Sequence, residues 1–305
     1  MSIKLSYIYV TKNKYEYVKI TLSNLINHKG VDDEIIVVDG NSSDGTVSYL
    51  YDLEKSGYID ILVSEDDINE SHAWNKGILL ANGELIKLIS DDDIFFYDSI
   101  KRCKDFMLAN NEVEVLFGST YDVQSQNLDS LRFLQSSLDD FLKYRDFQTP
   151  FTFCGLSLMF RKSIISKFGL FSTLTFAPDT EFSLRITKLK ANITYYNDPL
   201  CIRVENPSSN FSFETAYKFE YEGVFLLYAL KIISNSSFVF FNLKFYFKSL
   251  IRRLIFTNAK KAEKFNNGFI VDKIFYTKIT EEVKKDFNYN IVNSDLFIRS
   301  TTWNS

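Results

Sequence analysis

Residues 85–93 read Leu85-Ile-Lys-Leu-Ile-Ser-Asp-Asp-Asp93, so a short apolar run is separated by one serine from three consecutive carboxylates. The run has the length and composition of a buried strand. Three adjacent carboxylates at the end of a strand repel one another unless a cation neutralises them. A solvated acidic turn that caps a helix starting near Tyr97 is the alternative. The position directly after a buried strand favours a site for a hard divalent ion.

Strand-like and helix-like patterns alternate along the first hundred residues. We expect helices around residues 18–26 and 73–80, and strands at residues 5–10, 34–39, 60–63 and 84–89. Strands 20–30 residues apart with helices between them predict a parallel, right-handed βαβ sheet that is covered on both faces. Ligands of such sheets bind at the carboxyl ends of the strands, where Asp39 and the three carboxylates fall.

Composition narrows the classes of function. The chain has 305 residues, a net charge of −4 and two histidines, His28 and His72. A negative net charge does not favour binding to the phosphate backbone of nucleic acid, so we expect no nucleic-acid partner. Two histidines exclude a multi-histidine zinc site, so any metal is held mainly by oxygen, which favours magnesium, manganese or calcium.

Cysteine usage and hydropathy indicate the compartment. Cys103, Cys154 and Cys201 form no close pair and are odd in number, which favours a reducing cytoplasm. The first ten residues are too short and too interrupted for a signal peptide, and no apolar run reaches the roughly 18 residues of a membrane span. We expect a cytoplasmic protein that is soluble or peripheral to a membrane.

Phosphate-binding glycine motifs are absent from the sequence. Neither a Walker lysine motif nor G-x-G-x-x-G occurs, which weakens ATP hydrolysis and NAD chemistry as functions.

Several stretches in register resemble family 2 glycosyltransferases, whose fold is called GT-A. The resemblance covers residues 4 to about 97 in family order and spacing, and it rests on Val10-Thr-Lys-Asn13, Ile36-Val-Val-Asp-Gly-Asn-Ser-Ser-Asp-Gly-Thr46, Ser64-Glu-Asp-Asp-Ile-Asn-Glu-Ser-His-Ala-Trp-Asn-Lys-Gly77, Asn82-Gly-Glu84 and Ser90-Asp-Asp-Asp93. It implies an α/β, Rossmann-like domain with a mixed, mainly parallel sheet that binds a nucleotide sugar.

A looser resemblance continues into the half of these enzymes that binds the acceptor. It rests on residues 156–162, 168–171 and 177–185, and it fades after Val204. About two thirds of the chain is therefore covered.

The resemblance implies roles for residues on the donor side of the site. Asp39 would bind the base or ribose of the nucleotide. Thr11 and Asn13 would line the nucleotide cleft, and Asp67 and Asn75 would lie beside it.

It also implies a metal site and a catalytic base. Asp91 and Asp93 would form the D-x-D signature that binds Mn²⁺ or Mg²⁺, with Asp93 as the direct ligand of first choice and Asp92 nearby. Asp179 matches the base, with Glu181 as second candidate. Asp179 could instead be the N-cap of a helix over residues 180–188.

These residues suit the chemistry of sugar transfer. A metal ion stabilises the charge that grows on the leaving diphosphate, and a carboxylate removes the proton of the acceptor hydroxyl. We therefore predict an inverting, metal-dependent glycosyltransferase of the hexosyltransferase type. The resemblance implies a UDP-sugar donor and, as acceptor, a cell-surface glycan or a lipid-linked saccharide. A sugar-nucleotide nucleotidyltransferase and a non-catalytic nucleotide- or glycan-binding protein are the alternatives.

Three positions depart from the family pattern. The family often has an acidic residue where this chain has His72, and a second acidic residue where it has Gly40. A histidine common in the acceptor half is absent near residues 153–155. These departures concern the identity of the donor sugar more than the type of reaction. We expect Trp74 in the core and assign no site role to it or to His72.

The last third of the chain has a different character. The polar stretch 205–210 predicts a boundary between a GT-A domain at 1–206 and a helical extension at 207–305, which holds 15 of the 29 phenylalanines. Helical patterns around 217–232 and 240–256 predict two helices, and Lys244, Lys248 and Arg252 recur every four residues beside apolar positions. These helices could meet an anionic membrane at the inner face of the cell, or pack on the catalytic domain or another subunit.

Overall fold

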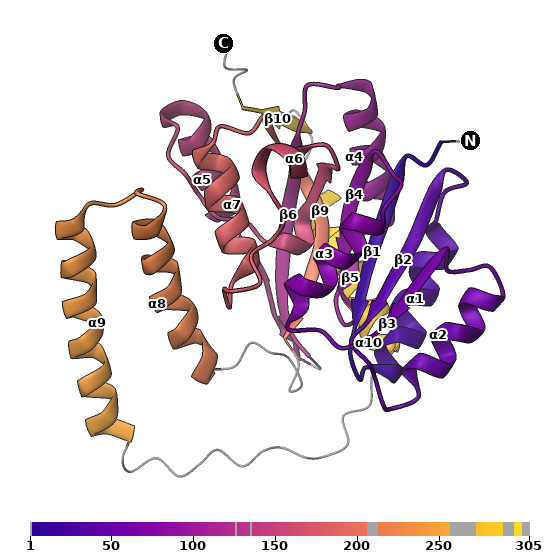
Figure 1. Ribbon diagram of the computed structural model, residues 1–305, viewed down its shortest axis with the longest axis horizontal. Helices are drawn as coiled ribbons and strands as arrows, with labels where there is room; N and C mark the ends of the chain where they lie inside the picture. Colours follow the sequence, from indigo (N-terminus) through magenta and orange to yellow (C-terminus); the bar gives the residue numbers. More distant parts are fainter. Residues whose placement is uncertain are drawn as a thin grey trace.

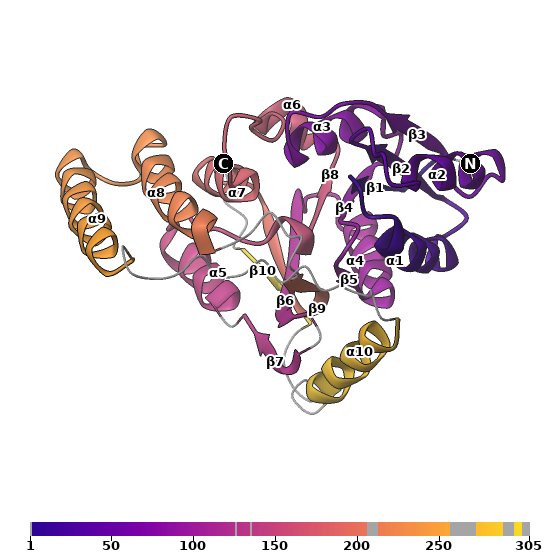
Figure 2. The same cartoon turned by 90° about the horizontal axis from the view of Figure 1, so that it is seen from below.

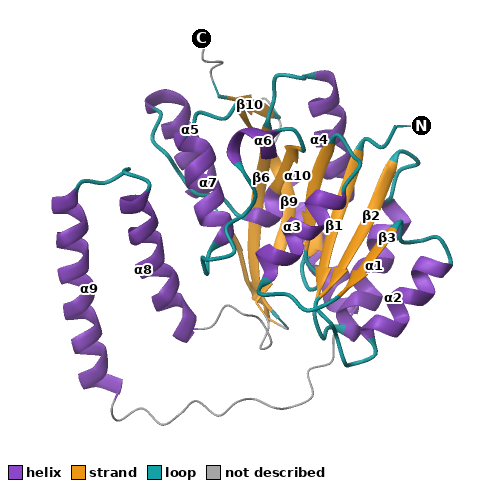
Figure 3. Cartoon of the chain, viewed as in Figure 1, coloured by secondary structure: helices purple, strands orange, loops and turns teal. Residues whose placement is uncertain are grey.

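The apolar runs of the N-terminal half form parallel strands at the centre of a mixed sheet. The computed structural model describes residues 2–125, 127–134, 136–205, 213–256, 273–288 and 296–300. The four N-terminal strands pair in parallel in the order β4-β1-β2-β3 (Figures 1 and 3), and they are β1 (Leu5–Thr11), β2 (Asp33–Asp39), β3 (Ile61–Ser64) and β4 (Leu85–Ile89). Their carboxyl ends therefore share one edge of the sheet.

The second half of the chain widens this sheet. Within the described residues the order is β10-β9-β6-β8-β4-β1-β2-β3, with β5 paired to β9 and β7 paired to β6. Strand β8 is antiparallel to β4 and β6, whereas β6 and β9 are parallel to each other. The added strands are β5 (Ile94–Phe95), β6 (Val115–Gln124), β7 (Asn127–Phe133), β8 (Leu158–Arg161), β9 (Ile193–Glu205) and β10 (Phe297–Arg299). The predicted α/β fold is confirmed.

Helices cover both faces of the sheet, which explains the continuous apolar strands. Along β1, Ile8 and Val10 face one core cluster, and Tyr7 and Tyr9 face the other. The first face carries α3 (Glu70–Leu80), α5 (Ser136–Phe147), α6 (Ile164–Phe168) and α7 (Pro178–Lys188). The second face carries α1 (Tyr15–His28), α2 (Thr46–Lys55) and α4 (Tyr97–Ala109).

The C-terminal third contains more than the two predicted helices. Helices α8 (Phe213–Ala229) and α9 (Asn235–Phe256) form a hairpin next to α7 (Figures 1 and 2). Helix α10 (Lys273–Asn288) packs on β5, β6 and β9, and β10 pairs with β9. The spacing of Phe275, Ile279 and Val283 signals the buried face of α10. The boundary near residue 206 stays a prediction.

No helix among the described residues is long and apolar enough to cross a membrane.

The turn between α3 and β4 requires glycine at position 83. A Cβ there would lie 2.5 Å from Ser6 Oγ and 2.7 Å from the Ser6 backbone nitrogen. We expect Gly83→Ala to lower the free energy of unfolding by about 1–3 kcal/mol, because backbone must move to admit the methyl group.

A matched change tests this expectation. Gly223 lies in α8 with no atom within 4 Å of an added Cβ, so Gly223→Ala is expected to raise stability by about 0.5–1 kcal/mol. Urea unfolding of both variants gives the comparison. Equal stabilities would show that the turn tolerates a side chain.

Candidate functional site

The three carboxylates lie at the carboxyl end of β4, where Asp91 and Asp93 are buried and Asp92 is partly exposed. Asp91 is 8% exposed and Asp93 is 5% exposed. Helix α4 begins at Tyr97 with Phe96 as its N-cap residue. The alternative of a solvated acidic turn that caps this helix is therefore wrong.

Neighbouring elements hold Asp91 and Asp92 in place. The Thr11 hydroxyl, at the end of β1, donates to Asp91 Oδ2 over 2.7 Å, and the Thr21 hydroxyl of α1 donates to the Asp91 carbonyl over 2.9 Å. Lys14 Nζ lies 3.0 Å from Asp92 Oδ2. The loop after β4 is thus tied to both ends of the β1–α1 connection.

Ser90, strand β9 and helix α10 form hydrogen bonds with the Asp93 side chain and the Asp92 backbone. Ser90 donates to Asp93 Oδ2, and the Val204 amide of β9 donates to Asp93 Oδ1 over 2.8 Å. The Tyr276 hydroxyl of α10 donates to the Asp92 carbonyl over 2.6 Å. The sequence analysis did not identify Tyr276 as a partner of this loop, although the amphipathic pattern of α10 can be seen in the sequence.

Lys14 pairs with Asp92, but the three adjacent carboxylates still crowd negative charge at this loop, which suits a cation. Burial raises the pKa of both Asp91 and Asp93, and the neighbouring charge of Asp92 raises both further. Oxygen ligands of this kind fit Mg²⁺ or Mn²⁺. Among the described residues no three acidic, histidine or cysteine side chains converge as a metal site. A cation at Asp91 and Asp93 would therefore take its other ligands from substrate oxygens and water.

The ends of β1 and β2 form a second cluster beside this loop. Asp39 is fully buried and accepts hydrogen bonds from the Ser42 amide over 2.9 Å and the Ser64 hydroxyl over 2.8 Å. Asn13 has a φ of 54°, and its Oδ1 accepts from the Ser43 amide over 2.8 Å. Thr11, Asn13 and Asp39 are thus brought together, as the resemblance implies.

Asp67 explains one departure from the family pattern. A Cβ on residue 40 would lie 3.3 Å from Asp67 Oδ2. Asp67 Oδ1 lies 2.7 Å from Lys76 Nζ and 3.3 Å from His72 Nδ1. A carboxylate therefore lies close to Gly40 even though that residue is not acidic.

Asn75 is engaged inside the protein. Its amide donates to the Phe171 carbonyl over 2.8 Å and accepts from the Phe171 amide over 3.0 Å. These two bonds join α3 to the segment before α7, and contact of Asn75 with a nucleotide stays a prediction. The neighbouring Trp74 is 4% exposed and packs on Phe171, which confirms its place in the core.

Asp179 and Glu181 lie in the first turn of α7 but in different environments. The helix begins at Pro178 with Ala177 as N-cap residue, so Asp179 is not the cap. Asp179 Oδ2 accepts from the Gly155 amide over 3.2 Å, and burial raises the pKa of Asp179. Glu181 forms two hydrogen bonds with the Arg185 guanidinium, at 2.7 and 2.8 Å.

Glu70 joins the two sides of the site and was not singled out from the sequence. Desolvation by the surrounding protein raises its pKa, although the side chain still reaches solvent, and the charges of Asp92 and Asp179 raise the pKa further. The acidic loop and Asp179 therefore both raise the pKa of Glu70, the first residue of α3. One feature of the sequence could have indicated Glu70. This chain has His72 where the family often has an acidic residue, and Glu70 is an acidic residue two positions earlier.

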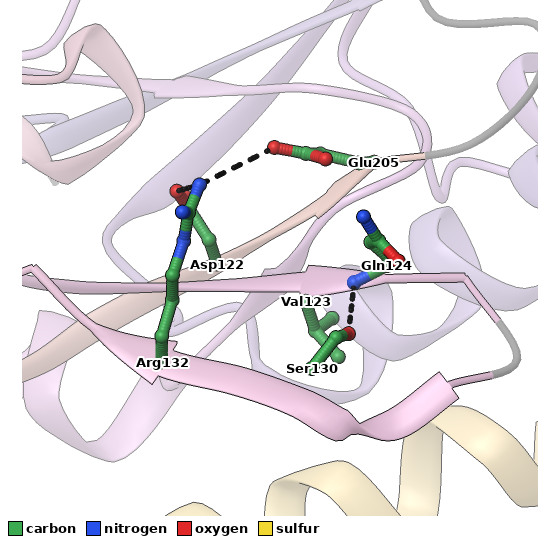
Figure 4. A pocket seen from close by; sticks show the side chains of 6 residues that line it. All are labelled: Asp122, Val123, Gln124, Ser130, Arg132 and Glu205. Carbon is green, nitrogen blue, oxygen red and sulfur yellow. Dashed lines mark hydrogen bonds and ion pairs between the residues drawn. The ribbon is translucent and has the colours of Figure 1, made fainter.

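A polar pocket of about 180 Å³ lies next to this site, at the ends of β6, β7 and β9 (Figure 4). Asp122 forms ion pairs with Arg132 at 3.1 Å and with Arg203 at 2.8 Å. The charge of Arg203 also acts on Asp93 and Asp179. The pocket is smaller than ordinary ligand sites and contains none of the predicted site residues.

Comparison with known proteins identifies the family. Residues 6–169, more than half of the chain, match Glycosyl transferase family 2. The chain belongs to this family. It is 23% identical over 209 residues to a poly-beta-1,6-N-acetyl-D-glucosamine synthase of Staphylococcus epidermidis, a match that covers 65% of this chain and 49% of the synthase. The chain thus spans about half the length of that curated relative.

Solved structures agree on the fold. A mannosyltransferase from Pyrobaculum calidifontis, in complex with GDP-Man and Mn²⁺, aligns with a TM-score of 0.59 at 16% identity over 96% of this chain and 88% of its own. TarS 1-349 of S. aureus, in complex with UDP-GlcNAc, aligns with a TM-score of 0.53 at 18% identity over 74% and 66%. The predicted GT-A fold is confirmed.

The contact of α10 with the acidic loop can be tested by removing one oxygen. Tyr276→Phe deletes the hydroxyl that bonds the Asp92 carbonyl, so we expect the free energy of unfolding to fall by about 1 kcal/mol. We also expect faster hydrogen exchange of the amides near Asp92.

Thr277→Val is the control, because the Thr277 hydroxyl bonds only within α10, to the Lys273 carbonyl. Unchanged exchange of the loop amides in Tyr276→Phe would mean that α10 does not hold the loop.

Proposed function

We propose that this protein is an inverting, metal-dependent glycosyltransferase that uses a nucleotide-sugar donor. One observation carries the proposal: the carboxylates of Asp91 and Asp93 are buried at the carboxyl end of β4, where the ligands of such sheets bind. Asp179 comes from a segment almost ninety residues away, and its charge acts on Glu70 together with the charges of the acidic loop, which supports a shared site. Membership of Glycosyl transferase family 2 supports this chemistry.

Asp91 and Asp93 are the proposed ligands of Mn²⁺ or Mg²⁺. Their burial and mutual repulsion favour a bound cation. When bound, a divalent ion acts as a Lewis acid that stabilises the charge on the departing diphosphate. Lys14, held at Asp92, adds positive charge on the same side. Mn²⁺ accompanies GDP-Man in the Pyrobaculum calidifontis structure, which supports the assignment.

Asp179 is the proposed base. A carboxylate with a raised pKa accepts a proton from the acceptor hydroxyl more readily than an ordinary one. The Gly155 amide orients one of its oxygens. Glu181 suits this role less, because Arg185 already neutralises both of its oxygens.

Asp39, Thr11 and Asn13 are proposed to bind the nucleotide, with Asp67 and Asn75 beside them. We propose a UDP-sugar as donor, on the family resemblance and on the UDP-GlcNAc complex of TarS. The acceptor is proposed to be a cell-surface glycan or a lipid-linked saccharide, at the cytoplasmic face of the membrane. A screen of nucleotide sugars, with UDP-GlcNAc and GDP-mannose included, for Mn²⁺-dependent hydrolysis and transfer identifies the donor.

The same screen separates the two alternatives. A nucleotidyltransferase would release diphosphate from a nucleoside triphosphate. A non-catalytic protein would bind a nucleotide sugar and turn over none of the panel. Either result would contradict the proposal.

Removing one charge tests the metal site. Asp93→Asn keeps the size of the side chain, so we expect a folded protein that loses about 100-fold or more of its Mn²⁺-dependent rate. Asp105→Asn, an exposed change on α4, is the control and should leave the rate unchanged. Full activity of Asp93→Asn in the presence of a chelator would rule out the metal assignment.

A pair of variants tests the base. Asp179→Asn should lower transfer by roughly 10²–10⁴-fold with little change in donor binding. Since only the ionised carboxylate accepts a proton and its pKa is raised, the wild-type rate should fall with acidification at a higher pH than an ordinary aspartate would give.

Glu181→Gln is the matched comparison, because it breaks the pair with Arg185. We expect it to lower the free energy of unfolding by about 1–3 kcal/mol while the transfer rate stays near wild type. The opposite pattern in the two variants would make Glu181 the base.

A further inference from the structure

Helix α9 exposes a row of large apolar side chains. Val239, Leu243 and Tyr246 are 56%, 54% and 60% exposed. At 3.6 residues per turn they fall within an arc of about 60° on the helix. Phe240, about 60° beyond this arc, is 65% exposed. We call Val239, Phe240, Leu243 and Tyr246 the α9 stripe.

The α9 stripe faces away from the neighbouring helix. Phe238 stacks on Tyr228 of α8 with ring centroids 4.1 Å apart, and Phe245 lies 5.0 Å from Tyr221. These contacts lie on another side of α9, so α8 does not cover the stripe. Figures 1 and 2 both place α9 on the outer side of the hairpin, with α8 between it and α7.

The charge of α9 favours an anionic surface. Its sequence, Asn235–Phe256, contains four cations and no carboxylate, although the whole chain has a net charge of −4. Lys244 is exposed and lies one turn after Phe240, at the border of the stripe. A symmetric dimer through α9 would bring these like charges together, which disfavours a second copy as the partner.

The hairpin is fixed to the part of the chain that carries Asp179. Glu222 of α8 accepts hydrogen bonds from the Phe176 amide, at 2.8 and 2.9 Å, and from the Ala177 amide, at 3.1 Å. Ala177 is the N-cap residue of α7. A surface bound by α9 is therefore coupled to the segment that leads into Asp179.

We propose that α9 binds in the interface of an anionic lipid membrane, with the α9 stripe inserted and its cations at the phosphate groups. An amphipathic helix with apolar residues beside lysine and arginine lies in the plane of such an interface. The binding does not depend on the sugar chemistry, so it can be tested without a known donor.

Flotation of the full chain with lipid vesicles tests this proposal. We expect binding to vesicles of phosphatidylcholine mixed with phosphatidylglycerol, weaker binding to phosphatidylcholine alone, and release by high salt. Val239→Ser combined with Leu243→Ser should lower the partition coefficient about tenfold or more. Lys244→Glu should lower it about fivefold or more, on the mixed vesicles only.

A matched pair elsewhere on the surface is the control. Val31 and Leu79 are 94% and 64% exposed, so Val31→Ser with Leu79→Ser removes the same two side chains from the catalytic domain. This control should bind vesicles as the wild type does. Near-UV circular dichroism checks that all variants are folded.

Three results would overturn the proposal. The first is absence of binding to the mixed vesicles, and the second is equal loss of binding in the α9 pair and the control pair. The third is a concentration-dependent dimer in lipid-free buffer that the α9 changes abolish, because it would make a second copy the partner of the stripe.

Discussion

The need to hold three carboxylates at the buried end of one strand organises this protein. Asp91, Asp92 and Asp93 follow β4 after a single serine, and two of them are nearly inaccessible to solvent. Such a loop is unfavourable unless each charge or backbone group finds a partner. Its partners come from parts of the chain that are far apart: β1 and α1 hold one side, and β9 and α10 hold the other. The repulsion that remains favours a cation.

This constraint joins the two halves of the fold. The residues proposed to bind the donor include Thr11 and Asp39, which the topology alone brings to one edge of the sheet, at the ends of parallel strands. The part of the site around Asp179, the proposed base, depends on longer connections, since Asn75 ties α3 to the segment before α7. Helix α8 then contacts that same segment through Glu222. The C-terminal hairpin is therefore joined to the segment that leads into Asp179.

Sequence alone predicted the strands of the N-terminal half because each contains an apolar run, and β1, β2 and β4 are buried on both faces. It placed the acidic loop for the same reason, since position after a buried strand distinguishes it from a surface turn. It could not predict that α10 holds this loop, because the contact of Tyr276 spans 184 positions and depends on the path of the chain. The family resemblance put Asp179 before Glu181, but the sequence could not show the ion pair with Arg185 that distinguishes Glu181 from Asp179. For Glu70, the sequence shows only an acidic residue two positions before the place where the family often has one.

The central claim is that Asp91 and Asp93 bind a nucleotide sugar through a divalent ion. Calorimetric titration of UDP into the protein, with and without Mn²⁺, tests it most directly, because it needs neither the sugar nor the acceptor. We predict that UDP binds tightly only when Mn²⁺ is present, and that Asp91→Asn combined with Asp93→Asn removes this dependence. Equal affinity with and without the metal, in both proteins, would contradict the account.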